Sequence, residues 1–179
     1  MQAKNAASGG LSRRDFLAKG SAAALLTLTA TAVICPTEGW GLAVKGVKPE
    51  TMRTLIHMAR DIYPHDKLGD RIYALALKGL DGAAAKDGAT RDMLEEGVRK
   101  LNATSELAHQ TSFDKVAWED QRLKLLRQIE PSPFFQKIRS TLVTGIYNNR
   151  EVWTKLGYEG PSAEKGGYIK RGFDDIDWL

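Results

Sequence analysis

The residue types best suited to acid–base or metal chemistry are a histidine next to an aspartate and an acidic cluster near the C-terminus. His65 and Asp66 could form a base and the group that orients it, but adjacent side chains rarely face each other, so a turn with solvated polar groups is favoured. Asp174, Asp175 and Asp177 carry the oxygen ligands that hard cations prefer. Their spacing does not match a calcium-binding loop, which favours a solvated acidic end.

Other catalytic and cofactor signatures do not appear in the sequence. The glycines at 39, 41 and 46 do not fit the Gly-x-Gly-x-x-Gly pattern of a dinucleotide site, and no strand is expected before them. The single cysteine, Cys35, excludes an intramolecular disulfide, a thiolate-only zinc site and a Cys-x-x-Cys-His haem attachment. The prediction is a chain with no catalytic residue, no metal site and no cofactor of its own.

The N-terminal residues resemble a twin-arginine translocation signal. The residues that carry this signal are Ser12, Arg13, Arg14, Phe16, Leu17 and Lys19. The match departs from the usual pattern at Ala18, which separates the leucine from the lysine. Two small-x-small stretches, Ala30-Thr31-Ala32 and Gly41-Leu42-Ala43, are candidate cleavage sites.

The uncharged stretch after the arginines, residues 20–37, would make only a weak permanent membrane anchor. It contains Thr27, Thr29 and Thr31, whereas a spanning helix needs roughly 20 mostly apolar residues. We therefore expect export to the periplasm. The twin-arginine route implies that the protein crosses the membrane already folded.

The basic character of the chain belongs mostly to this leader. The 179 residues carry a formal net charge of +4, and three of these charges belong to residues 1–32. The remainder is close to neutral, which removes the argument for a nucleic-acid partner.

Apolar residues at helical spacing predict an all-α fold, a small bundle of four to six short helices without strands. The expected helices cover about 49–62, 70–78, 91–110, 112–128 and 133–147, followed by a short helix that ends at Leu156. The start and stop signals are Pro49, Thr90, Ser132-Pro133 and Gly157, with a small-residue linker expected over 79–88. Ser112 and Asp114 are both candidate starts for the fourth helix.

The last part of the chain, residues 157–179, is rich in glycine and in aromatic residues and is expected to form an irregular, extended C-terminal arm. Aromatic side chains bury large areas and are enriched at interfaces. The candidate partner-binding residues are Trp153, Tyr158, Tyr168, Phe173 and Trp178. Two interpretations stay open, in which the arm covers the helices of its own chain or docks on a partner.

These features divide the chain into four expected parts. They are a signal peptide over 1–32, a linker over 33–48, a helical domain over 49–156 and the arm over 157–179.

The second half resembles the gluconate 2-dehydrogenase subunit 3 family. The matching stretches are Pro133-Phe134-Phe135, Gly145-Ile146-Tyr147-Asn148-Asn149, Val152-Trp153, Leu156-Gly157-Tyr158-Glu159-Gly160-Pro161, Gly166-Gly167-Tyr168 and the ending from Gly172 to Leu179. The resemblance implies a small subunit of a membrane-associated sugar or sugar-acid dehydrogenase. In such complexes the large subunit carries FAD, and a cytochrome c subunit with haem c typically passes electrons toward quinone. The small subunit bears the leader and escorts the leaderless flavoprotein.

The sequence therefore predicts a non-catalytic, periplasmic subunit, peripheral to the inner membrane through its complex. Its expected partners are the FAD-dependent large subunit, a cytochrome c subunit and the twin-arginine translocase. The substrate is left open among gluconate, sorbitol, glucose and other polyols. Two alternatives are a free-standing periplasmic binding or structural module and an autonomous enzyme that uses His65, Asp66 or the C-terminal aspartates.

Overall fold

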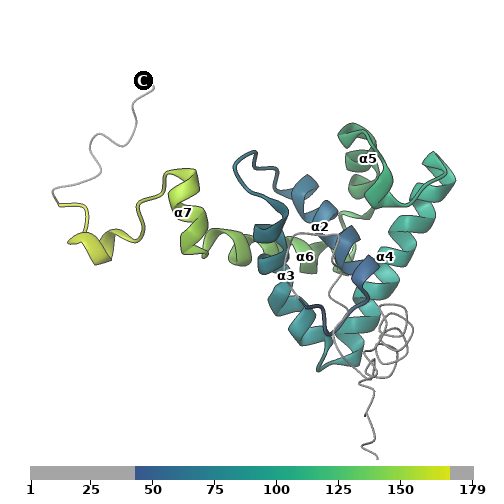
Figure 1. Ribbon diagram of the computed structural model, residues 1–179, viewed down its shortest axis with the longest axis horizontal. Coiled ribbons are helices and arrows are strands. Elements are labelled where there is room, and N and C mark those ends of the chain that lie inside the picture. Colours follow the sequence, from purple (N-terminus) through teal and green to yellow (C-terminus); the bar gives the residue numbers. More distant parts are fainter. Residues whose placement is uncertain (1–42, 170–179) are drawn as a thin grey trace, which may run out of the picture. The chain divides into compact units, whose positions relative to one another are not determined.

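The computed structural model describes residues 43–169, and within that range the protein is all-helical, as predicted. The α-helices are α2 (Pro49–Ile62), α3 (Asp70–Ala84), α4 (Gly88–His109), α5 (Glu119–Ile129), α6 (Pro133–Tyr147) and α7 (Arg150–Leu156) (Figure 1). Two short 3₁₀ helices, η1 (Phe113–Lys115) and η2 (Ser162–Lys165), complete the elements. None of the helices within 43–169 is long and apolar enough to cross a bilayer.

Helix α3 lies at the centre of the bundle and packs against α2, α4 and α6. Its apolar side is fully buried, with Tyr73 and Leu77 among the largest enclosed side chains. The contact with α6 is the most extensive, and it is close because Gly145 has no side chain. A Cβ atom at Gly145 would lie 2.8 Å from the backbone of Ala76, so the two helices could not approach in this way with any larger residue there.

Helix α2 begins at Pro49, as the sequence predicts. The hydrogen-bond donors at its start are satisfied by a residue from another helix. Glu95 of α4 accepts hydrogen bonds from the backbone N–H of Lys48 at 2.7 Å and from the Thr51 hydroxyl at 2.8 Å. A carboxylate at a helix N-terminus also interacts favourably with the helix dipole. The start of α2 is thereby fixed to the side of α4.

The linker expected over 79–88 is wrong, because α3 continues through it to Ala84. The α-carbons of Gly79 and Gly82 face open space, whereas Leu80, Asp81 and Ala84 turn inward and are buried. Burial of these residues offsets the conformational cost of the two glycines.

Helix α4 also starts earlier than Thr90, the expected cap. Asp87 is the N-cap, and its carboxylate accepts hydrogen bonds from the backbone N–H groups of Ala89 and Thr90 and from the Thr90 hydroxyl. The carboxylate satisfies N–H groups that have no partner within the helix, and these hydrogen bonds lower the pKa of Asp87.

The fourth expected helix does not begin at Ser112 or Asp114. The chain instead makes the η1 turn, which buries Phe113, and α5 begins only at Glu119. The guanidinium of Arg122 donates a hydrogen bond to the carbonyl of Val116 at 2.8 Å, so a side chain and not a helical N–H group pairs with that carbonyl. These tertiary contacts prevail over the local helix signals.

Arg122 also forms the most enclosed ion pair among the described residues. Its Nε and a terminal nitrogen donate to the two carboxylate oxygens of Asp61 on α2 at 2.8 and 2.9 Å. The side chains of Asp61 and Arg122 are only 4% and 16% exposed. These hydrogen bonds raise the pKa of Arg122, so the guanidinium stays charged and ties α5 to α2.

The segment before α2 is fastened to α3 by an arrangement that we call the Asp81 clip. The carboxylate of Asp81 accepts hydrogen bonds from the backbone N–H groups of Lys45 at 3.0 Å, Gly46 at 2.9 Å and Val47 at 3.2 Å. Val44 and Val47 pack against the hydrophobic core. The end of the expected linker is therefore held on the helical domain.

Candidate functional site

The sequence-predicted site residues divide between the described part of the chain and its two ends. Trp153 lies on α7, and Tyr158 and Tyr168 lie on the arm. The six residues of the export signal, Ser12, Arg13, Arg14, Phe16, Leu17 and Lys19, lie outside the described residues, as do Phe173 and Trp178.

The boundaries of α6 and α7 follow the local signals predicted for them. The Ser132 hydroxyl accepts the backbone N–H of Phe135 at 3.2 Å, and Pro133 is the first residue of α6. The Asn149 side chain accepts the backbone N–H of Glu151 at 3.0 Å and begins α7. Gly157 ends α7 with a positive φ of 79°, a conformation that favours glycine.

Trp153 and Tyr158 form an aromatic pair where the arm leaves α7. Their ring centroids are 5.3 Å apart in an edge-to-face arrangement, and the Trp153 indole N–H donates to the carbonyl of Tyr147 at 2.5 Å. The guanidinium of Arg150 lies 5.7 Å from the Trp153 ring centroid, within cation–π range. Trp153 therefore links α6, α7 and the arm.

Tyr147, at the end of α6, connects this pair to the turn after α2. Its hydroxyl lies 2.9 Å from the His65 Nε2 atom, and its ring makes an edge-to-face contact with Tyr63. Burial raises the pKa of Tyr147. The local sequence pairs His65 only with its neighbour Asp66 and does not predict this contact, because His65 and Tyr147 are far apart in the chain.

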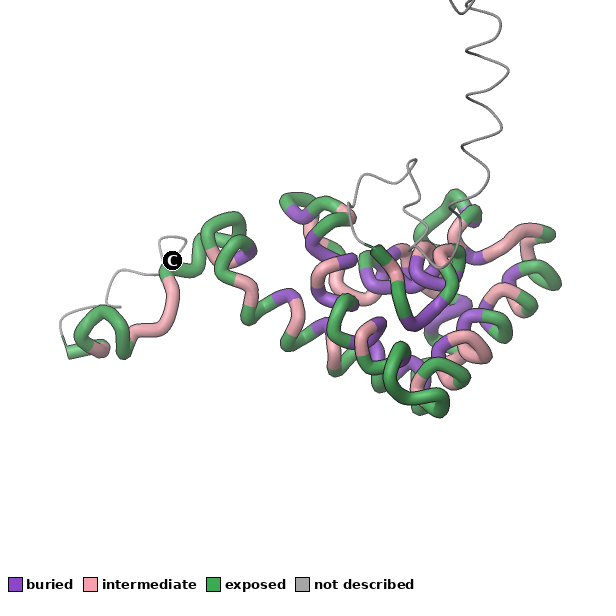
Figure 2. The backbone as a smooth tube through the Cα atoms, turned by 60° about the horizontal axis from the view of Figure 1, so that its bottom comes forward, coloured by how far each residue is buried: buried purple, intermediate pink, exposed green. Residues whose placement is uncertain are grey.

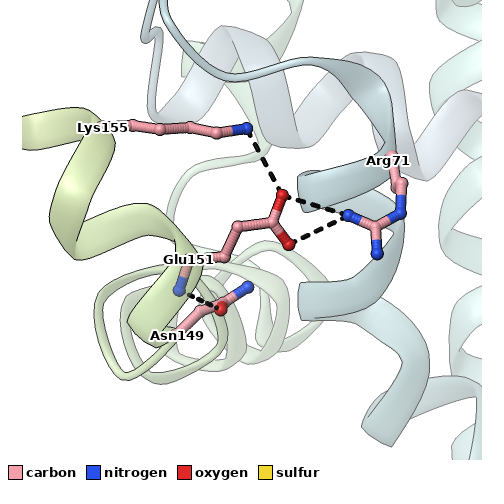
Figure 3. Close-up of polar contacts among 4 residues, drawn as sticks. All are labelled: Arg71, Asn149, Glu151 and Lys155. Carbon is pink, nitrogen blue, oxygen red and sulfur yellow. Dashed lines mark hydrogen bonds and ion pairs between the residues drawn. The ribbon is translucent and has the colours of Figure 1, made fainter.

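An ion-pair network attaches α7 to α3, as Figure 3 shows. Arg71 donates from one guanidinium nitrogen to both carboxylate oxygens of Glu151 at 2.9 and 3.1 Å, and Lys155 contacts the same carboxylate at 3.4 Å. The hydrogen bond from Arg71 is the main cause that lowers the pKa of Glu151. Because these groups are exposed, salt weakens the network.

The described part of the arm, residues 157–169, contains no buried residue, and in Figure 2 it is drawn in the green and pink of exposed and intermediate positions. Tyr158 is 52% exposed, Tyr168 68% and Ile169 86%. The backbone N–H of Tyr158 donates to the Trp153 carbonyl, and the Glu164 carboxylate pairs with Arg150. These contacts anchor the arm to α7. Large apolar side chains thus remain accessible along α7 and the arm.

A separate groove of about 860 Å³ lies between the start of α2, α4 and the η1 turn. Its walls carry side chains of both charges, including Lys48, Glu50, Asp92, Glu96 and Arg99. The mixture of charges does not define one type of ligand. No group of three or more potential metal ligands occurs among the residues that the structure describes.

In the comparisons with known proteins, no family model, curated protein or solved structure matches the chain.

Proposed function

We propose that this chain is the non-catalytic small subunit of a periplasmic FAD-dependent sugar or sugar-acid dehydrogenase, similar to gluconate 2-dehydrogenase. In this proposal it escorts the leaderless flavoprotein subunit through the twin-arginine translocation route. The reaction takes place on the flavoprotein, while this chain supplies the export signal and a docking surface.

The observation that carries the docking role is the exposure of the arm. Tyr158 and Tyr168 are large aromatic residues at more than half exposure, on a segment without a buried residue in its described part. Aromatic side chains are enriched at protein interfaces, where they bury large areas at a modest entropic cost. This supports the second of the two interpretations of the arm, in which its rings pack on a partner.

The export role is supported by the sequence of the leader. Arg13 and Arg14 stand in register with Phe16 and Leu17, followed by the uncharged stretch over 20–37. A chain that carries such a leader and docks on a leaderless enzyme would bring it across the membrane as a folded pair.

Co-purification with an enzyme assay tests the complex. The tagged chain is isolated from the periplasm of its host, and the eluate is examined for flavin absorbance and for dye reduction that depends on added gluconate, sorbitol or glucose. We expect a stoichiometric flavoprotein with such activity. A lone monomer without flavin in the periplasm contradicts the proposal.

A leader variant tests the escort role separately. The double variant Arg13→Lys/Arg14→Lys should leave the flavoprotein in the cytoplasm, whereas the control variant Lys4→Gln changes a leader charge outside the motif and should not. Dehydrogenase activity in the periplasmic fraction measures both. Equal periplasmic activity in the two strains would show that the flavoprotein travels without this chain. Sugar binding by the isolated chain would instead favour the free-standing binding module.

A further inference from the structure

The Asp81 clip bears on where the leader is removed. The sequence offers two cleavage sites, after Ala32 and after Ala43, and local patterns do not decide between them. The first site lies outside the described residues, and so do Gly41 and Leu42 of the second, whereas Ala43 and the residues after it are described. The contacts of the residues that follow Ala43 therefore determine how accessible the second bond is.

These residues are held tightly to α3. The backbone N–H of Lys45 donates to one oxygen of the Asp81 carboxylate, and those of Gly46 and Val47 donate to the other. Val44 is partly buried against the core, and Gly46 and Val47 are buried.

Gly46 lies so close to α3 that only a residue without a side chain fits at this position. A Cβ atom there would fall less than 3.0 Å from the backbone of Asp81 and Ala85. The segment consequently lies directly on the helix, with no room for another chain between them.

A protease binds the residues on both sides of the bond that it cuts as an extended strand, through their backbone N–H and C=O groups. To cut after Ala43, it must therefore bind Val44, which packs against the core, and Lys45, whose backbone N–H the clip holds. The bond becomes available only when the segment detaches from α3. The cleavage rate then follows the small population of that open state.

We propose that the leader is removed at the bond after Ala32 and that the Asp81 clip protects the bond after Ala43 from the same protease. This inference rests on the part of the proposed function that makes residues 1–32 an export leader. Because the twin-arginine route delivers folded proteins, the protease meets the clip already formed. The bond after Ala32 is separated from Lys45 by residues 33–44, so cutting there leaves the clip intact.

The test uses the purified full-length chain, incubated with bacterial signal peptidase I in detergent micelles. Intact mass and N-terminal sequencing identify the product. We expect a product that begins at Val33. A product that begins at Val44, or no cleavage at all, overturns the proposal. Because neither a partner nor transport is needed, this result is independent of whether the chain escorts a flavoprotein.

Variants then test the clip itself. Ala32→Phe blocks the first site, and this variant should remain uncut after Ala43. Adding Asp81→Asn or Gly46→Ala should open the clip and speed cleavage after Ala43 by about tenfold or more, because the open state becomes more populated. Asp87→Asn, added to Ala32→Phe, is the matched control, since Asp87 also accepts backbone N–H groups but does not contact the clip. Rapid cleavage after Ala43 in the Ala32→Phe variant alone overturns the proposal.

A second readout covers the case in which Asp81→Asn unfolds the domain. Hydrogen exchange of the unmodified chain reports directly on the amides of Lys45, Gly46 and Val47. We expect slow exchange at all three, with loss of protection in Gly46→Ala while far-UV circular dichroism stays unchanged. Unprotected amides at these positions in the unmodified chain would show that no clip shields the bond.

Discussion

The Asp61–Arg122 ion pair offers a sharp test of how the bundle is held together. We consider the substitution Arg122→Met, which keeps much of the side-chain volume and removes the guanidinium. Asp61 would then remain with its side chain 4% exposed and without its bidentate partner. Removing one member of a buried pair typically costs about 3–5 kcal/mol, because an uncompensated charge is left in the interior.

The residue before Asp61 supplies the matched control. Arg60 pairs with Asp70 at 2.6 Å, but these side chains are 51% and 42% exposed. An exposed ion pair contributes only about 0–1 kcal/mol, so Arg60→Met should change stability little. The two substitutions are chemically identical, but Arg122 and Asp61 are enclosed whereas Arg60 and Asp70 are exposed. Arg122→Met also removes the hydrogen bonds to the Val116 and Ala117 carbonyls, which adds to its expected loss.

The assay is chemical unfolding of the full chain in guanidinium chloride, followed by circular dichroism at 222 nm. We expect a large decrease in the unfolding free energy for Arg122→Met and a small one for Arg60→Met. The double variant Asp61→Leu/Arg122→Met should recover much of the loss, since it leaves no unpaired charge. Equal losses in the two single variants, or a double variant that is less stable than Arg122→Met, would refute the reasoning.

Three further predictions concern other parts of the molecule. Gly145→Ala should destabilise the bundle by about 1–3 kcal/mol in the same unfolding assay, because the new Cβ atom would press on Ala76 of α3. Tyr73→Phe should cost about 1 kcal/mol through loss of the 2.7 Å hydrogen bond from its hydroxyl to the Tyr63 carbonyl. Burial raises the pKa of Tyr73, so above a pH of about 10 the folded state keeps a proton that the unfolded state releases. The unfolding free energy should therefore fall as the pH rises above about 10. Unfolding measured from about pH 8 to about pH 11 should show a shallower decrease in Tyr73→Phe. Truncation after Gly160 should weaken flavoprotein binding in pull-down assays more than it lowers helix content, and equal losses would show that the arm is part of the core.

Local chemistry in the sequence was sufficient to predict several helix boundaries. Pro49 begins α2, Ser132 and Pro133 begin α6, and Gly157 ends α7, as expected. At each of these positions the side chain or the backbone preference of one residue decides the conformation, with little help from the rest of the protein.

The extension of α3 could not be predicted in this way, because it depends on residues from elsewhere in the chain. Gly79 and Gly82 each cost roughly 1 kcal/mol in a helix, whereas burying Leu80 contributes roughly 1.5–3 kcal/mol. Asp81 adds the clip, whose three donors lie more than 30 residues earlier. Gly97 similarly lowers the helix propensity of α4, and the sequence alone does not show that the Phe134 ring packs directly against it.

In the candidate site, too, some features follow from the local sequence and others depend on contacts between distant residues. Its aromatic composition was evident from the sequence, and this marked Trp153, Tyr158 and Tyr168. The contact between His65 and Tyr147 joins residues 82 positions apart in the chain. The pair of Arg71 and Glu151 is separated by 80 positions. Neither contact has a local signature, so only the fold could reveal them.

The Asp81 clip also determines how mechanical force would enter the protein. A pull on the N-terminal side of the domain would first load the backbone of residues 45–47 and pass through three hydrogen bonds to Asp81 in the last turn of α3, before it reached α2. Residues 45–47 should therefore detach from α3 before the rest of the domain unfolds. In an optical-tweezers record this detachment should appear as a small extension step ahead of global unfolding.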